Sequence, residues 1–157
     1  MKSLGFANHD HVACIETGVA AAAAHCAERG LQLTPVRKRV LEILLKEHRA
    51  MGAYDILDVL RGEGFNSQPP VAYRALDFLV GQGFVHRVEG LNAFVACSHP
   101  GVQHDAAFLI CRGCRTVAET EIPVSALNAA SKQAGFNMEG ATVEVQGLCS
   151  DCKEDGI

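Results

Sequence analysis

Four of the seven cysteines form two CxxC pairs, Cys111/Cys114 and Cys149/Cys152. Two thiolates three residues apart bind one ion from a tight turn, and two such turns complete a tetrahedral four-cysteine site. One alternative is two unrelated cysteine pairs; another is a redox-active CxxC, which needs a βαβ setting that the sequence does not indicate. The pattern therefore predicts a closed structural metal site, with zinc favoured and iron compatible with the ligand type.

A second group of potential ligands is more widely spaced. Its members are His86, Cys97, His99, His104 and Glu119. His86 and Cys97 fall on the two strands of an expected hairpin, whereas His104 and Glu119 flank the first CxxC pair. Each of these residue types is also common as an ordinary surface or core residue. Spacing alone leaves this second site open, because mixed nitrogen, sulfur and oxygen ligand sets have no tight sequence signature.

A polar helix face is the third candidate. Pro69-Pro70 predicts the start of a helix on which Tyr73, Arg74 and Asp77 point away from the apolar residues. The Arg74 guanidinium suits guanine O6 and N7 in the major groove, and Tyr73 suits a phosphate or a thymine methyl group. The alternative is a solvated face with an intrahelical Arg–Asp pair.

The elements that position these residues follow from a change in periodicity near residue 82, from helical spacing to alternation. The first part is expected to hold helices at about 9–29, from Thr34-Pro35 onward, at 53–61 and at 69–81, then strands at 84–89 and 93–97. The expected buried residues are Val40, Leu41, Leu44, Leu45, Ile56, Leu57, Leu60, Ala72, Ala75, Leu76 and Leu79. Three short helices followed by a hairpin predict a winged helix-turn-helix.

The second part reads as strands at 107–111, 116–122 and 141–148 with one helix at 124–134. A small unit of this kind has unpaired strand edges and an apolar helix face, which favours association. The expected fold class is α+β, with an N-terminal winged helix-turn-helix domain and a small C-terminal α/β dimerisation domain. The expected boundaries are 1–89, with the hairpin extending to about 97, and 98–157.

Composition and charge limit the function classes. The 157 residues are 48% hydrophobic and 20% charged, which excludes wholesale disorder. Residues 31–88 carry eight Lys/Arg and six Asp/Glu, whereas residues 89–157 carry four and nine, so only the middle of the chain is suited to phosphate. No apolar run approaches the roughly 20 residues that span a bilayer. We expect a cytoplasmic protein, in which CxxC pairs indicate metal rather than disulfides.

The sequence resembles the ferric uptake regulator family, and within it the zinc uptake regulator branch. The similarity extends over about residues 20–152, and its motifs are AYDILDVL at 53–60, PPVAYRALDFL at 69–79, GFVHRVE at 83–89, FLICRGC at 108–114 and GLCSDC at 147–152. The resemblance implies a homodimer that binds a palindromic, AT-rich operator. It also implies two zinc ions per chain, a structural one on the four CxxC cysteines and a regulatory one near the hinge. The implied regulatory ligands are His86, Cys97, His104 and Glu119.

Two departures bear on which metal is sensed. The stretch Gln103-His104-Asp105 replaces the His-rich segment typical of the iron branch, which removes support for an additional site. Cys97 supplies a thiolate where iron sensors favour nitrogen and oxygen, and a softer ligand set suits zinc better than ferrous iron.

The sequence is therefore interpreted as a zinc-responsive repressor of zinc uptake genes, with no enzymatic activity, membrane association or small-molecule substrate. The residues expected to contact DNA are Tyr54, Tyr73, Arg74, Arg37, Lys38 and Arg39. The alternatives are a regulator of the same family that senses iron or another metal, a zinc-stapled adaptor, and a zinc enzyme. A zinc deaminase would need an H-x-E motif, which is absent from the sequence, and an open coordination position, which a four-cysteine site lacks.

Overall fold

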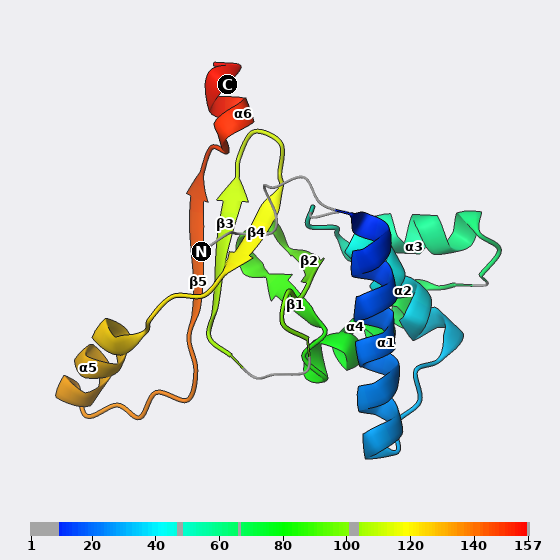
Figure 1. Ribbon diagram of the computed structural model, residues 1–157, viewed down its shortest axis with the longest axis horizontal. Coiled ribbons are helices and arrows are strands. Elements are labelled where there is room, and N and C mark those ends of the chain that lie inside the picture. The colour runs from blue at the N-terminus through cyan, green and yellow to red at the C-terminus, as the bar shows by residue number, and fades with distance from the viewer. Residues whose placement is uncertain (1–9, 47–48, 66, 101–103, 157) are drawn as a thin grey trace.

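The computed structural model describes residues 10–46, 49–65, 67–100 and 104–156 (Figure 1). The N-terminal half contains α1 (His11–Arg29), α2 (Pro35–Lys46), α3 (Ala53–Gly62), α4 (Pro69–Gly81), β1 (Val85–Val88), the 3-10 turn η2 (Glu89–Leu91) and β2 (Ala93–Ala96). The C-terminal half contains β3 (Ala106–Cys111), β4 (Val117–Thr120), α5 (Ser125–Gln133), β5 (Thr142–Gly147) and α6 (Ser150–Glu154). None of the helices in the described residues is long and apolar enough to cross a membrane.

Local signals set the boundaries of the N-terminal helices. The Asp10 side chain accepts a hydrogen bond from Val12 N and begins α1, and Gly30 ends this helix with φ 65°, a conformation that favours glycine. Proline occupies the first turn of α4, where its missing N–H costs nothing. β1 and β2 then pair antiparallel as a hairpin, hereafter the wing. The predicted winged helix-turn-helix is confirmed.

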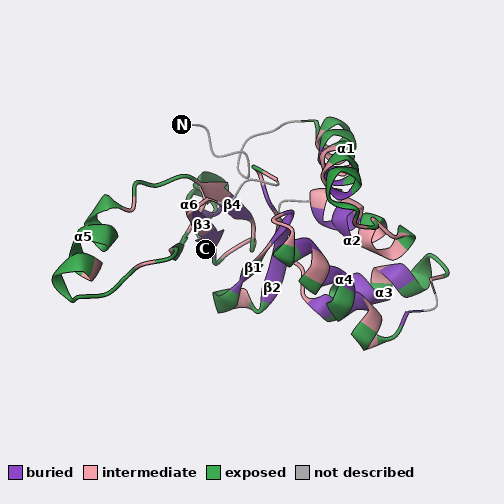
Figure 2. Ribbon diagram, turned by 90° about the horizontal axis from the view of Figure 1, so that it is seen from below, coloured by how far each residue is buried: buried purple, intermediate pink, exposed green. Residues whose placement is uncertain are grey.

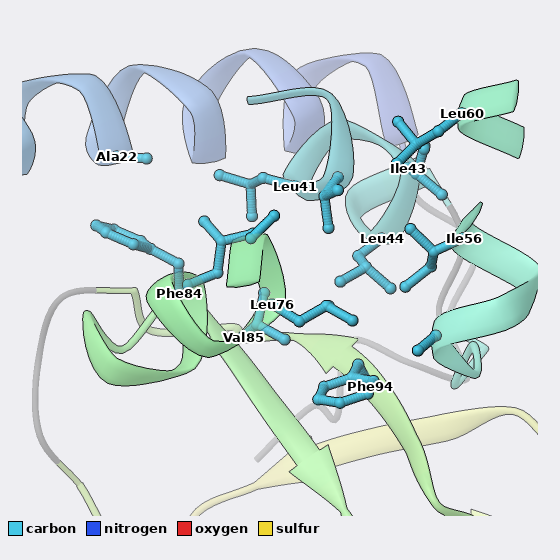
Figure 3. Packing of buried hydrophobic residues seen from close by; sticks show 14 residues of the cluster. Ala22, Leu41, Ile43, Leu44, Ile56, Leu60, Leu76, Phe84, Val85 and Phe94 are labelled. Atoms are coloured by element: carbon cyan, nitrogen blue, oxygen red, sulfur yellow. The ribbon is translucent and has the colours of Figure 1, made fainter. Parts of the chain in front are cut away.

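The core of this half lies between α1, the three following helices and the base of the wing (Figure 3). All of the buried positions predicted for α3 and α4 are buried. In α2 the prediction is wrong at one position, because Leu45 is only half-buried and Ile43 is buried instead. The side chain of Leu45 packs at the edge of the core, close to Gly18 of α1.

The C-terminal half is a three-stranded sheet in the order β4-β3-β5, with β4 antiparallel and β5 parallel to β3. Helix α5 has no buried residue and lies away from the sheet (Figures 1 and 2). Large apolar side chains are exposed here, namely Ile122, Leu127, Phe136 and Val145. The terminal helix α6 was not predicted from the sequence.

The wing packs against this sheet through a second apolar cluster, in which Val88 and Val95 meet Phe108 and Ile110. The segment between α2 and α3 adds a backbone connection, since Met51 pairs with Phe94 of the wing and Arg49 bridges to Thr116 beside β4. The two halves are thus in direct contact along the wing.

Candidate metal centres

The two CxxC pairs converge at one end of the sheet. Cys111 ends β3, and Cys149 follows β5 and begins α6. Because β3 and β5 are parallel, with Cys111 paired to Gly147, both CxxC pairs lie at the same end of the sheet. Four sulfur atoms, one from each cysteine, lie within 4.8 Å of one another; this four-cysteine cluster is Cys111, Cys114, Cys149 and Cys152.

The geometry of the four-cysteine cluster fits a tetrahedral zinc site. Zn–S bonds of about 2.3 Å place tetrahedral sulfur atoms about 3.8 Å apart, and Cys114 Sγ lies 3.8 Å from Cys149 Sγ. The N–H of Cys149 donates to Cys111 Sγ at 3.3 Å. Hydrogen bonds from the backbone N–H groups of Cys114 and Cys149 lower the pKa of Cys111 to about 6, which favours the thiolate that a metal requires.

Gly113 is a positioning residue of this cluster that the sequence analysis missed. A Cβ atom at Gly113 would lie 2.9 Å from Cys152 Sγ. The turn therefore needs glycine for close approach of the second CxxC pair. The only sequence signal is the glycine inside the first CxxC.

The second group of ligands meets at the contact between the wing and the sheet. His86 lies on β1, Cys97 directly follows β2, His104 precedes β3 and Glu119 lies on β4. One ligand atom from each lies within 4.8 Å of the others, and these four residues are called the hinge cluster. Glu119 Oε1 is central, 3.2 Å from His86 Nε2 and 2.5 Å from His104 Nε2.

Burial and hydrogen bonding set the charges of the hinge cluster. Burial opposes ionisation of Glu119, but the nearby His86 ring, the His104 ring and the hydrogen bond from the Ser98 N–H together lower its pKa to about 2. Burial, and then the negative charge of Glu119, raises the pKa of Cys97 to about 12. The thiol therefore holds its proton until a cation displaces it. A cation bound here would be held by two nitrogens, one sulfur and one carboxylate oxygen, a set that fits zinc.

His99 does not join the hinge cluster. Its ring lies beside His104, with centroids 5.7 Å apart, and its Nε2 is 3.7 Å from the carboxylate of Glu121. The side chain is exposed, so it lies at the rim of the site rather than within it. The backbone N–H of Ser98 donates a hydrogen bond to the second carboxylate oxygen of Glu119 at 2.8 Å. Sequence patterns do not reveal this contact.

The residues expected to contact DNA differ in exposure and in the number of intramolecular contacts that their side chains make. Tyr54, Tyr73 and Arg74 are exposed on α3 and α4, and no contact between Arg74 and Asp77 is present among the described residues. Lys38 is exposed and lies 3.9 Å from Glu42. These side chains are available to an external partner.

The other two cations carry intramolecular contacts. Arg39 binds Glu63 at 2.5 Å and Glu42 at 2.9 Å, and these carboxylates raise its pKa. Arg37 donates to the Gln32 carbonyl at 2.7 Å and stacks 3.7 Å from the Phe78 ring centroid. Both arginines therefore make contacts within the N-terminal half of the chain. Their position in the sequence did not indicate these contacts.

The family assignment rests on both halves of the chain. The sequence profile of the Ferric uptake regulator family matches residues 28–146. The chain belongs to this family. Its relatives include the zinc uptake regulation protein of Escherichia coli K12, 39% identical over 132 residues that span 82% of this chain and 77% of that protein. The zinc uptake regulation protein of Mycobacterium tuberculosis H37Rv is 29% identical over 130 residues, 79% of this chain and 96% of that one.

Solved structures of family members match this chain to different degrees. The crystal structure of holo XcZur is 45% identical and matches 88% of this chain and 98% of its own with a TM-score of 0.80. A zinc uptake regulator complexed with zinc and DNA is 37% identical, covers 90% and 97%, and gives 0.84. Apo XcZur, also 45% identical with 89% and 98% covered, gives only 0.53. Over the whole chain, the structure is therefore more similar to the holo and DNA-complexed proteins than to the apo form.

Proposed function

We propose that this chain is a zinc-responsive transcriptional repressor of zinc uptake genes, a DNA-binding regulator and not an enzyme, acting in the cytoplasm. The observation that carries the proposal is the hinge cluster, in which ligands from the wing and from the sheet meet at one point. The similarity to zinc uptake regulation proteins, one of them solved with zinc and DNA, supports the same metal and the same partner.

Two zinc ions per chain account for the two groups of ligands. The four-cysteine cluster would hold one ion in a closed, structural site, and the hinge cluster would hold the regulatory ion. Iron is a poorer fit for the hinge cluster, since Cys97 provides a thiolate. The hinge ion would bind two ligands from residues 1–97 and two from residues 98–157, the proposed DNA-binding and dimerisation domains.

The proposed switch is a change in the position and orientation of the wing relative to the C-terminal sheet. An ion bound to His86 and Cys97 on the wing side and to His104 and Glu119 on the sheet side favours the closed arrangement. It shifts the equilibrium only by its difference in affinity for the two arrangements. The large difference between the holo and apo forms of XcZur in their match to this chain supports two such arrangements.

Dimerisation would cover the exposed apolar residues of the C-terminal half. Helix α5 has no buried residue, and Leu127 and Phe136 expose 45% and 64% of their surface. Burial of these apolar side chains against a second chain would favour association. A two-fold dimer would place two copies of α4 on one side, as a palindromic operator requires.

The function is tested by measuring operator binding with fluorescence-labelled DNA. The probes are the promoter of a zinc uptake gene from the same genome and a duplex of equal length with scrambled sequence. Zinc is expected to tighten binding to the promoter duplex by about 5- to 150-fold, since allosteric couplings are typically about 1–3 kcal/mol. Equal affinity for both duplexes, with and without zinc, would contradict the proposal.

Replacing Arg74 with alanine is expected to abolish specific binding while the dimer and its zinc content stay intact. A lost bidentate base contact costs about 1–3 kcal/mol, and a symmetric dimer loses it twice. Lys38→Ala is the matched control, because an exposed phosphate contact should weaken both duplexes alike and lower the salt dependence. Unchanged promoter affinity of Arg74→Ala would exclude α4 from sequence recognition.

A further inference from the structure

A row of three residues crosses the C-terminal sheet under the wing. Glu144 on β5 is in register with Phe108 on β3, and Phe108 is in register with Glu119 on β4. Residues paired in this way direct their side chains to the same face of a sheet. His86 of the wing lies against this face, with its ring centroid 5.3 Å from that of Phe108. The row therefore presents two carboxylates to the wing, one on each side of Phe108.

The Glu144 carboxylate binds the tip of the wing directly. Its Oε1 accepts a hydrogen bond from Glu89 N at 2.6 Å, and its Oε2 accepts one from Gly90 N at 2.9 Å. Hydrogen bonds from N–H groups to an ionised carboxylate are stronger than those between neutral groups. This contact joins the two halves of the chain without a metal ion, through residues 54 and 55 positions apart.

Gly90 makes this contact possible. A Cβ atom at this position would lie 2.7 Å from Glu144 Oε2, closer than real Cβ contacts allow. A side chain here would therefore move the Glu144 carboxylate away from the two N–H groups that it binds. Gly90 and Glu144 thus form a matched pair from two distant parts of the sequence.

We propose that Glu144 is a positioning residue of the zinc switch, which fixes the orientation of the wing while the hinge cluster binds the ion. The inference rests on the proposed function. An ion bound to His86 and Cys97 attaches the base of the wing, beside the hinge cluster, and makes no contact with the tip of the wing. The second attachment, at Glu89 and Gly90 on the other side of Phe108, holds the tip of the wing and opposes its rotation about the hinge cluster.

The orientation of the wing determines the position of α4. The helix leads directly into the wing, and Phe84 N donates to the Leu79 carbonyl at 2.9 Å across this connection. In a dimer, a rotation of the wing would therefore change the separation of the two recognition helices, which must match the half-site spacing. Zinc binding alone would then be insufficient for full operator affinity.

The test is a zinc titration of operator binding for Glu144→Gln and Gly90→Ala in the full-length protein, with the promoter duplex as probe. Glu144→Gln keeps the size of the side chain and replaces one acceptor oxygen with an NH2 group. Each variant is expected to bind the operator about tenfold more weakly at saturating zinc, with unchanged zinc content and dimer. The double variant should lose little more, because both changes remove one contact. Glu139→Gln, an exposed carboxylate in the same half, is the charge-matched control.

Hydrogen exchange of the zinc-loaded dimer provides a second readout. The amides of Glu89 and Gly90 should exchange faster in Glu144→Gln than in the parent protein, while those of β3 should not change. If both variants match the parent in operator affinity while the parent responds to zinc, the positioning role is wrong. If the parent itself shows no zinc response, the proposed function fails instead. If Glu144→Gln does not fold, Gly90→Ala decides the question.

Discussion

Replacing Cys111 with serine is expected to release the structural zinc and to leave the C-terminal half unfolded or aggregated, without a dimer. Cys111 is 1% exposed. It belongs to the first CxxC pair, and its sulfur accepts a hydrogen bond from the backbone N–H of Cys149 in the second pair. A structural zinc site supplies roughly 10 kcal/mol or more of folding free energy, comparable to the whole net stability of about 5–15 kcal/mol. The loss is measured by zinc content, gel filtration with light scattering, and thermal unfolding.

Cys14→Ser is the matched control, since Cys14 is a half-buried cysteine of α1 outside both clusters. It should keep the full zinc content and the dimer. A Cys111→Ser protein that remained a soluble dimer with less zinc would contradict the structural role of the ion. Full zinc content in this variant would contradict the assignment of the four cysteines as ligands.

Replacing Cys97 with alanine is expected to give a folded dimer that keeps the structural zinc but binds the operator no better when zinc is added. Cys97 is remote in sequence from both CxxC pairs and belongs to the hinge cluster alone. Without its thiolate only His86 holds the ion from the wing side, and the closed arrangement loses most of its advantage. Typical couplings of about 1–3 kcal/mol are small enough for this loss to abolish the response.

The measurement compares zinc stoichiometry, oligomeric state and operator affinity across a zinc titration. His99→Ala is the control, because His99 lies two residues away and outside the hinge cluster. It should retain the zinc response. If the operator affinity of Cys97→Ala increased at the same free zinc concentration as that of the parent, Cys97 would be a packing residue. The regulatory site would then lie elsewhere.

Short-range patterns account for much of the fold. Proline at residues 35 and 69 marks where α2 and α4 begin, and the i, i+3, i+4 spacing in α4 identifies all four of its buried residues. The four-cysteine cluster is recognisable for the same reason, since each CxxC pair is local. The hinge ligands lie on separate elements, so their spacing leaves the site open, and only the family resemblance singles them out.

Long-range contacts account for what the sequence did not predict. Arg39 faces Glu63, 24 residues later, and nothing in the basic run at residues 37–39 indicates this ion pair. Ile43 is buried, whereas Leu45 lies half-buried at the edge of the core beside Gly18 of α1, a difference that depends on tertiary packing and not on helical spacing. Helix α6 is only five residues long, too short to show an apolar period.

In the proposed mechanism, an ion in the hinge cluster, separate from the ion of the four-cysteine cluster, switches DNA binding. The most direct test is to measure zinc per chain and operator affinity in the same samples, across a series of buffered free zinc concentrations. We predict that a first zinc ion per chain remains bound at low free zinc without tight operator binding, and that affinity rises as a second ion binds. Tight operator binding by protein that holds a single zinc ion per chain would show that an ion in the hinge cluster is not needed for DNA binding.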